Sequence, residues 1–397
     1  MIIEPVIKGV VARASHPYGC EQSILKQINY VKSAKSIQAG PKRVLIIGAS
    51  SGFGLAARIA LTFGGSNADT IGVSFERGPS DKGTGSAGWY NNHFFKKYAN
   101  REGHTAVNIQ GDAFSDQTKE EVIEAIETYF EGEVDLIIYS VAAGVRPDPK
   151  GSDDMLRSAI KPIGQSFSGA TIQLENDQWQ QQTISPATEE EIDATLQIMG
   201  GQDWEAWVDA LINVESIAQG CKTIAFSYIG SEVTHPIYLD GTLGRAKVDL
   251  HQTSHSLNLK LANYQGNAYA TVCKALVTKA SVFIPGLTPY LTALYKVMKE
   301  KGTHEGCIEQ MQRLFSDKLY TQDSVPVDAE RLVRMDDWEM NVDTQERVQS
   351  LLAQLNKDNF AQLADYQGVK TEFLNLNGFG FDNIDYSEPV DLSVFHK

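Results

Sequence analysis

The chain has 397 residues, of which 42% are hydrophobic, and a net charge of −15 with an isoelectric point near 5.0. This length and composition allow a large buried core, whereas the excess of acidic residues argues against nucleic acid or an anionic membrane surface as a partner. No signal-like segment opens the chain and no window holds the about 20 apolar residues that span a bilayer, so we expect a cytoplasmic protein without membrane insertion.

Predicted elements in chain order indicate an α/β fold. Residues 1–40 form an N-terminal extension with one helical stretch at 21–35. From residue 42 to about 285, apolar runs of strand length alternate with helical patterns, which is typical of a Rossmann-type, doubly wound parallel sheet. The predicted strands are 43–47, 70–75, 105–109, 134–139, 222–226 and 281–284, and the predicted helices include one that ends at Phe63 and one at 119–130.

Two segments depart from this alternation. Residues 148–190 are rich in Gly, Ser, Gln and Pro, which predicts either an insertion near a binding site or a surface excursion. Residues 286–397 have mostly helical patterns, with amphipathic stretches at 290–301 and 342–355. No linker divides the chain, so we expect one elaborated domain over residues 1–397.

The four cysteines are far apart and form no C-x-x-C pair. Neither a zinc site nor a disulfide framework is indicated, so we expect no metal and mostly buried free thiols. They are Cys20, Cys221, Cys273 and Cys307.

A glycine-rich turn follows the strand predicted at 43–47 and opens a helix. Its sequence is Gly48-Ala49-Ser50-Ser51-Gly52-Phe53-Gly54. Glycines at such a turn let backbone N–H groups approach a pyrophosphate at the helix N-terminus. The G-x-x-x-G-x-G spacing is that of short-chain reductases, so the turn predicts a dinucleotide site.

Glu76 lies at the end of the next predicted strand. An acid here accepts hydrogen bonds from the adenosine ribose and repels a 2′-phosphate, which favours NADH over NADPH. The neighbouring Arg77 weakens that preference, and a solvated acid at a strand end is the ordinary alternative.

Two further turns are candidates for the cofactor. Asp112 and Ala113 follow the third strand, where an adenine would lie, although an Asp in a strand-end turn is also commonplace. The small residues of Tyr139-Ser-Val-Ala-Ala-Gly144 follow the fourth strand and allow the nicotinamide side to approach the backbone. The alternative is a tight turn that requires Gly.

Reduction of a polarised double bond requires a group that stabilises the developing oxyanion. In reductases of this architecture a Tyr hydroxyl, helped by a Lys, has this role, and a nearby ammonium makes the phenol proton easier to share. Tyr238 and Lys247 follow the fifth predicted strand, where such a pair is expected. Two other pairs lie far beyond the glycine turn, namely Tyr295 with Lys299 and Tyr366 with Lys370. We interpret the first pair as the two sides of an amphipathic helix and the tyrosine of the second as packing.

Six motifs together resemble the FabV class of enoyl-[acyl-carrier-protein] reductases and the related trans-2-enoyl-CoA reductases, over residues 2 to about 386. They are the glycine turn, Phe75-Glu76, Gly88-Trp-Tyr-Asn91, Gly111-Asp-Ala-Phe-Ser115, Tyr238-x8-Lys247 and the stretch from Lys296 to Gln310. The resemblance implies an enlarged short-chain dehydrogenase/reductase relative, usually monomeric. It also implies NADH-dependent reduction of a trans-2-enoyl thioester in fatty acid biosynthesis.

The resemblance also implies residue roles. Tyr238 is the proton donor or oxyanion stabiliser, Lys247 holds the cofactor and Tyr228 touches the substrate thioester. Two segments flank the nicotinamide, namely Val141-Ala142 on one side and Leu276-Val277-Thr278 on the other.

Two departures from the family pattern concern the acyl carrier. Val248 follows Lys247 where many carrier-protein enzymes have a second Lys, and residues 142–149 differ from the usual pattern. The acyl group could therefore be carried by acyl carrier protein or by CoA. The three lysines at 296, 299 and 301 are one candidate contact for an acidic carrier protein. The alternatives to an enoyl reductase are a carbonyl reductase and a catalytically silent NAD-binding regulator.

Overall fold

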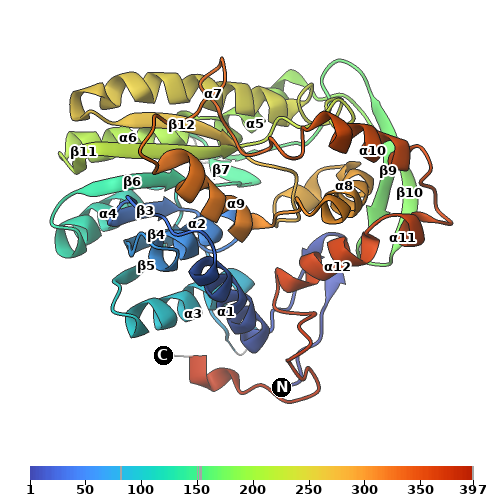
Figure 1. Cartoon of the computed structure of the whole chain (residues 1–397), viewed down its shortest axis with the longest axis horizontal. Helices are drawn as coiled ribbons and strands as arrows, with labels where there is room; N and C mark the ends of the chain where they lie inside the picture. The colour runs from blue at the N-terminus through green and yellow to red at the C-terminus, as the bar shows by residue number, and fades with distance from the viewer. Residues whose placement is uncertain (81–82, 150, 152–153, 396–397) are drawn as a thin grey trace.

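The computed structural model describes residues 1–80, 83–149, 151 and 154–395. In this part of the chain, seven strands form one parallel sheet in the order β13-β12-β11-β6-β3-β4-β5 (Figure 1). The order reverses at β3, which confirms the doubly wound Rossmann-type sheet. The strands are β3 Arg43–Ile47, β4 Asp69–Ser74, β5 Ala106–Gln110, β6 Val134–Tyr139, β11 Ile217–Ser227, β12 Asn267–Val272 and β13 Val333–Arg334.

Both faces of the sheet are buried, which explains why its strands are nearly continuous apolar runs. Along β3, Val44 and Ile46 join one core cluster and Leu45 and Ile47 join another, because successive side chains point to opposite faces. All four side chains are completely buried.

Helices cover each face (Figure 1). The first layer packs into the core cluster of Val44 and comprises α1 Pro17–Ser33, α2 Gly52–Phe63, α3 Ala87–Arg101 and α9 Cys307–Arg313, which a π-helix at Leu314–Leu319 continues. The second layer packs into the cluster of Leu45 and comprises α4 Asp116–Tyr129, α6 Gln202–Asn213 and α7 Thr242–Leu261, with α5 Glu189–Met199 against α7.

The segment 148–190 consists largely of β-hairpins. β7 Val145–Pro147 pairs with β8 Met155–Arg157, and β9 Phe167–Gln173 pairs with β10 Gln178–Ile184. Residues 150, 152 and 153 of this segment lie outside the described part. The β9–β10 hairpin packs against the C-terminal helices through Trp179 and Phe360, whose ring centroids lie 5.9 Å apart.

The C-terminal part is mostly helical, as predicted, and forms a third core cluster with β9. Its helices are α8 Leu287–Lys301, α10 Val342–Leu352, α11 Phe360–Leu363 and α12 Tyr366–Asn375, and a 3₁₀ turn lies at Leu392–Phe395. The N-terminal residues form a short hairpin of β1 Ile7–Lys8 and β2 Val11–Ala12 before α1. The Met1 ammonium donates to the Val390 carbonyl at 2.6 Å, so the N-terminus lies against the segment that follows α12.

The structure corrects some of the predicted elements. The prediction of a strand at 281–284 is wrong, since Ser281–Phe283 is a 3₁₀ turn, and the strands β12 and β13 were not predicted. The predicted strands 43–47 and 134–139 are present with the predicted bounds. The other three predicted strands and the helices at 21–35, 119–130, 290–301 and 342–355 are present with shifted ends. All four cysteines are free, with Cys307 partly exposed and the others buried. Among the described residues, no helix is long and apolar enough to cross a membrane.

Candidate active site

The predicted site residues gather at one edge of the sheet. The strands β3, β4, β5, β6, β11 and β12 run parallel, so the turns that follow their carboxyl ends meet there. In doubly wound sheets, ligands bind at this edge near the point where the strand order reverses.

The glycine turn after β3 requires its glycines. Gly48 has a φ of 91°, and a Cβ on it would lie 2.4 Å from the Ser140 carbonyl oxygen. A Cβ on Gly54 would lie 2.0 Å from the Gly48 carbonyl oxygen, so glycine lets α2 begin directly against the turn. Ser51 is the N-cap of α2 but makes no side-chain cap bond, which leaves the helix N-terminus open to an anion.

Glu76 is fixed beside this turn by residues from two elements. Its Oε1 accepts a hydrogen bond from the Ser50 hydroxyl at 2.7 Å, and the Asn91 side-chain amide donates to the Ser50 carbonyl at 2.9 Å. A Cβ on Gly88 would lie 1.9 Å from Glu76 Oε1, so the first turn of α3 approaches the carboxylate only because residue 88 is glycine. Sequence reasoning quoted Gly88 and Asn91 only as a motif, whereas the structure shows that they support the Ser50–Glu76 contact.

The adjacent Phe75 is 81% exposed, which is unusual for a large aromatic side chain and suits stacking against a flat ligand such as adenine. The open helix N-terminus, the glycine cradle and the Glu76 carboxylate together fit a dinucleotide with unmodified ribose hydroxyls.

Asp112 and Ala113 lie in the turn between β5 and α4. Asp112 Oδ1 accepts a hydrogen bond from the Phe114 N–H at 3.0 Å, which is the ordinary turn geometry of an Asp. The Ala113 carbonyl accepts from the Trp207 indole at 3.0 Å. Contact with an adenine stays a prediction.

Residues predicted to flank the nicotinamide follow β6 and β12. Val141 is half-buried and Ala142 is exposed after β6. Leu276 and Val277 are buried, and the Val277 N–H donates to the Tyr295 hydroxyl at 3.0 Å. The Thr278 methyl lies 3.9 Å from a Cβ built on Gly52, so the segment after β12 returns to the glycine turn.

Tyr238 and Tyr228 lie in contact after β11. Their ring centroids are 4.9 Å apart with the rings nearly perpendicular. Tyr238 is only 5% exposed, and its hydroxyl has no hydrogen-bond partner among the described residues. Burial raises the pKa of the Tyr238 hydroxyl above its usual value of 10.0, so it is a neutral proton donor at pH 7. The expectation that a nearby ammonium makes this proton easier to share stays a prediction.

Lys247 lies on the second turn of α7. Its ammonium donates to the Phe226 carbonyl at 3.2 Å, and burial lowers its pKa to about 8. The first turn of α7 packs closely against the backbone of Leu239, since a Cβ on Gly244 would lie 1.9 Å from the Leu239 carbonyl oxygen. Only glycine permits this approach. The backbone of Tyr238 also accepts from the Gly244 N–H at 2.9 Å, which couples the Tyr238 turn to the helix that carries Lys247.

Glu339 was missed from the sequence. This fully buried carboxylate accepts hydrogen bonds from the Tyr228 hydroxyl at 3.2 Å, the Tyr290 hydroxyl at 2.7 Å and the Ala275 N–H at 2.7 Å. Burial raises the pKa of Glu339 above its ordinary value. No local sequence signal marks it, because its partners lie on segments far away in the chain.

The competing Tyr–Lys pairs have structural partners. The Tyr295 hydroxyl donates to Glu372 at 2.6 Å, whereas the Lys299 ammonium binds Asp365 at 2.6 Å. Tyr366 packs edge-on against Phe360. Tyr295 is buried and Lys299 is exposed, so they lie on two sides of α8, as interpreted. Tyr295 nevertheless contacts the Val277 N–H beside the predicted nicotinamide segment, whereas Lys370 pairs with Asp177.

Three family models match the chain. A model described as the trans-2-enoyl-CoA reductase catalytic region matches residues 83–320, and one described as the NAD(P)H binding domain of trans-2-enoyl-CoA reductase matches residues 2–81. A third, described as an enoyl reductase FAD binding domain, matches residues 327–390. In the described structure of that segment, glycines occur only within or after α12, and no strand leads through a glycine turn into a helix as β3 does. These residues do not fit a flavin dinucleotide, and no step is derived through one.

Relatives and solved structures agree with the first two models. The chain is 72% identical to the enoyl-[acyl-carrier-protein] reductase [NADH] 2 of Vibrio parahaemolyticus, over 99% of this chain and 98% of the relative. It is 48% identical to the trans-2-enoyl-CoA reductase [NADH] of Clostridium beijerinckii, over 100% and 99% of the two chains. The crystal structure of Clostridium acetobutulicum trans-2-enoyl-CoA reductase in complex with NADH superposes with a TM-score of 0.97 at 46% identity, covering 100% and 99%. The chain therefore belongs to the trans-2-enoyl-CoA reductase family.

Proposed function

We propose that this protein reduces the carbon–carbon double bond of trans-2-enoyl thioesters with NADH, in fatty acid biosynthesis. The observation that carries the proposal is the buried Tyr238 ring beside Tyr228, whose hydroxyl has no hydrogen-bond partner within the described part of the chain, at the same sheet edge as the glycine turn and Glu76. A neutral phenol at this place is a hydrogen-bond donor for a thioester carbonyl. The names of the relatives, all reductases of enoyl thioesters, support the same reaction.

In this proposal the residues after the parallel strands hold NADH. The turn from Gly48 to Gly54 and the α2 N-terminus hold the pyrophosphate, and Glu76 binds the adenosine ribose. Lys247 holds the nicotinamide ribose. The remaining contacts are Phe75, Asp112 and Ala113 on the adenosine side, and Val141, Ala142, Leu276, Val277 and Thr278 beside the nicotinamide.

The bound cofactor supplies a hydride to C3 of the substrate. Tyr238 donates a hydrogen bond to the thioester carbonyl, which stabilises the negative charge that develops on this oxygen as C3 gains the hydride. The Tyr228 hydroxyl binds the same end of the substrate. A proton added at C2 then completes saturation, so one NADH and one proton are consumed for each double bond.

Substitution of Tyr238 tests this function directly. Tyr238→Phe keeps the ring but removes the donor, so kcat for NADH oxidation with crotonyl-CoA is expected to fall about 10²–10³-fold, while the Kd for NADH stays unchanged. Tyr129→Phe is the matched control, because Tyr129 is 52% exposed on α4. An unchanged kcat for Tyr238→Phe, or faster oxidation of NADH by a ketone than by crotonyl-CoA, would exclude the proposal.

The carrier, the location and the assembly state belong to the same proposal. The acyl group arrives on acyl carrier protein or on CoA, which relatives of this chain are named for. We infer a cytoplasmic monomer, in keeping with the family resemblance.

A further inference from the structure

The backbone of residues 274–278 continues the chain beyond β12 and leaves the sheet. The Cys273 N–H still donates to the Ser227 carbonyl of β11 at 2.9 Å. The N–H groups that follow donate to side chains instead. These bonds are Lys274 N–H to Gln310 Oε1 at 3.2 Å, Ala275 N–H to Glu339 Oε2 at 2.7 Å, Val277 N–H to the Tyr295 hydroxyl at 3.0 Å and Thr278 N–H to the Ser281 hydroxyl at 2.9 Å. Side chains of other elements therefore set the position of this backbone.

The completely buried Tyr295 on α8 joins this backbone to α12. Its hydroxyl accepts from the Val277 N–H and donates to Glu372 Oε2 at 2.6 Å. A phenol has one proton to donate, so the bond to Glu372 turns the lone pairs of the Tyr295 oxygen toward other donors. Glu372 thereby fixes the direction in which this oxygen accepts from Val277.

The ring of Tyr295 is also held by its neighbours. The His304 ring contacts it edge-on at a centroid distance of 4.3 Å, and the Lys274 ammonium lies 5.0 Å from its centroid. Rotation of the phenol away from Val277 would break these contacts together with the bond to Glu372. The phenol oxygen is therefore held between the Val277 N–H and the carboxylate.

The Glu372 carboxylate is charged at pH 7. Burial alone would raise its pKa, but hydrogen bonds from His304 and Tyr295 hold the pKa of Glu372 below its ordinary value. The positive charge of Lys274 acts in the same direction. A charged acceptor binds a phenol proton more strongly than a neutral one, so Tyr295 keeps its orientation.

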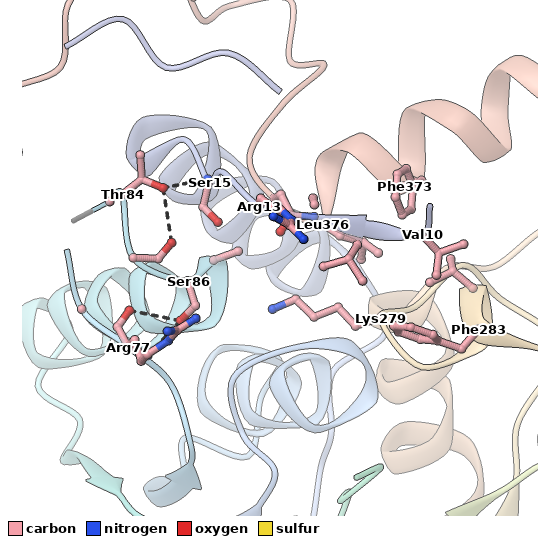
Figure 2. A pocket seen from close by; sticks show the side chains of 18 of the residues that line it. Val10, Arg13, Ser15, Arg77, Thr84, Ser86, Lys279, Phe283, Phe373 and Leu376 are labelled. Atoms are coloured by element: carbon pink, nitrogen blue, oxygen red, sulfur yellow. Dashed lines mark hydrogen bonds between the residues drawn. The ribbon is translucent and has the colours of Figure 1, made fainter. Parts of the chain in front are cut away.

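Figure 2 shows a second place where α12 and the chain after Thr278 meet. Both elements line a cavity of about 630 Å³, with Lys279 and Phe283 from the chain after Thr278 and Phe373 and Leu376 from α12. Phe373 directly follows Glu372. The contact through Tyr295 is therefore part of a broader approach of α12 to this segment.

Residues 274–278 lie where the proposed cofactor and substrate sites meet. Leu276 and Val277 belong to the hydrophobic cluster that Tyr228 contacts, and the Thr278 methyl lies 3.9 Å from a Cβ built on Gly52 of the glycine turn. Hydride transfer requires the reacting carbons to approach to about 3–3.5 Å, and a misplacement of about 1 Å can slow such a step strongly. The backbone beside the nicotinamide therefore has to be held accurately.

We propose that Tyr295 and Glu372 are positioning residues for hydride transfer, in which Glu372 orients the Tyr295 hydroxyl and the hydroxyl holds Val277 beside the nicotinamide. The inference rests on the proposed function and adds two residues to it. It also gives residues 327–390 a role that needs no flavin. Glu339 and Glu372 both come from that segment, and they reach the 275–277 backbone directly and through Tyr295, respectively.

Single-turnover kinetics test this role. Enzyme loaded with NADH is mixed with crotonyl-CoA, and a primary isotope effect with deuterated NADH identifies the hydride-transfer step. Tyr295→Phe keeps the ring but removes the acceptor for Val277, so the rate constant is expected to fall about 10-fold. The Kd for NADH, which in the proposal depends mainly on the glycine turn and Glu76, is expected to change less. A merely structural role would lower the amplitude and leave the rate constant unchanged, because unfolded enzyme does not react.

Variants of Glu372 test whether it acts through Tyr295. Glu372→Leu removes the acceptor and is expected to slow hydride transfer about as much as Tyr295→Phe, whereas Glu372→Gln keeps an acceptor oxygen and is expected to lose less. The double variant Tyr295→Phe/Glu372→Leu is expected to be no slower than Tyr295→Phe alone. Tyr98→Phe is the matched control, because the Tyr98 hydroxyl also donates to a glutamate, Glu21, at 2.6 Å but joins α3 to α1. It is expected to keep the wild-type rate constant.

Hydrogen exchange measures the Val277 N–H without turnover. With NADH bound, peptides that cover residues 274–278 are expected to exchange about 10-fold faster in Tyr295→Phe and Glu372→Leu than in the wild type, and equally fast in Tyr98→Phe. Unchanged exchange in Tyr295→Phe would overturn the inference. Faster exchange with an unchanged hydride-transfer rate would overturn it as well, since Tyr295 would then only hold the fold. Failure of the proposed function looks different, because the wild type itself would then not oxidise NADH with crotonyl-CoA.

Discussion

At the scale of single residues, burial controls the chemistry of the candidate site. The Tyr238 phenol stays neutral because its anion would be poorly solvated, and the same effect lowers the pKa of Lys247 to about 8. Lys247 is therefore much closer to losing its proton at physiological pH than an ordinary lysine. Its charge contributes to binding only while the proton is present.

This predicts a pH dependence for the free enzyme. Lys247 is charged below about pH 8 and neutral above it, so kcat/KM for NADH is expected to decrease as pH rises, with a midpoint near 8. Lys247→Arg keeps its charge throughout and is expected to lose this midpoint. Profiles of both proteins between about pH 6 and 10 check the prediction, and a midpoint that persists in the Arg variant would assign it to another group.

Much of the candidate site could be predicted from sequence, because its residues follow strands at recognisable turns. The glycine turn, Glu76, Tyr238 and Lys247 all lie at the same sheet edge in the structure. Glu339 could not be predicted, since its contacts with Tyr228 and Ala275 join segments distant in the chain. The close approach of Gly88 to Glu76 could not be predicted either, because the sequence does not show which atoms would collide with a side chain at position 88.

At the scale of elements, the junction of β3 and α2 depends on close backbone approach. A methyl group on Gly54 would collide with the Gly48 carbonyl and would also lie 3.1 Å from the Ser140 Cβ. The start of α2 must therefore shift away from the sheet if residue 54 is enlarged.

Gly54→Ala is expected to lower the free energy of unfolding by about 1–3 kcal/mol and to weaken NADH binding, because the α2 N-terminus moves. Gly144→Ala is the control for stability alone, since a Cβ there meets nothing within 4 Å, and its free energy of unfolding is expected to change by less than about 0.5 kcal/mol. Thermal unfolding and NADH titration measure both effects. Equal stability of the two variants would show that the turn adapts freely.

The errors in the predicted elements arise from contacts that the local composition does not show. The sequence Ser-Val-Phe-Ile at 281–284 has the composition of a strand, but hydroxyls fold it locally. The Ser281 N–H donates to the Thr278 side chain at 3.0 Å and the Thr278 N–H donates to the Ser281 side chain at 2.9 Å. Conversely, the small residues of Asn267–Val272 give a weak strand pattern, and β12 forms because β11 offers it a buried parallel edge.

At the scale of the whole molecule, residues 327–390 reach the candidate site through Glu339. The carboxylate joins the C-terminal segment to the start of the 275–286 segment, to α8 and to Tyr228. The turn between β13 and α10 therefore holds in place the Tyr228 side chain, for which we propose a substrate contact.

In the wild type, one Glu339 oxygen accepts from both tyrosines and the other accepts from the Ala275 N–H. The Glu339→Gln variant has one amide oxygen in place of the two carboxylate oxygens. Either the Ala275 N–H or the two tyrosines therefore lose their hydrogen-bond acceptor. The free energy of unfolding is expected to decrease by about 1–3 kcal/mol, and kcat is expected to decrease about 10-fold. Because Glu339 acts through Tyr228, the effects of Glu339→Gln and Tyr228→Phe on kcat are expected to be non-additive in a double-mutant cycle.

Glu300→Gln is the control, because Glu300 forms exposed ion pairs with Lys296 and Arg347, and the loss of these pairs is expected to cost under about 1 kcal/mol. Fully additive effects of Glu339→Gln and Tyr228→Phe would limit Glu339 to a structural role.

The order of strands in the sheet also matters during synthesis. The strands β3, β4, β5 and β6 emerge from the ribosome first and pair along one half of the sheet, but β6 then presents its other edge without a partner. Its neighbour β11 is translated only after the hairpins β7–β10 and the helices α5 and α6. An apolar edge left open for this interval can pair with other nascent chains, so β6 is the strand at which a chaperone most usefully protects the growing chain.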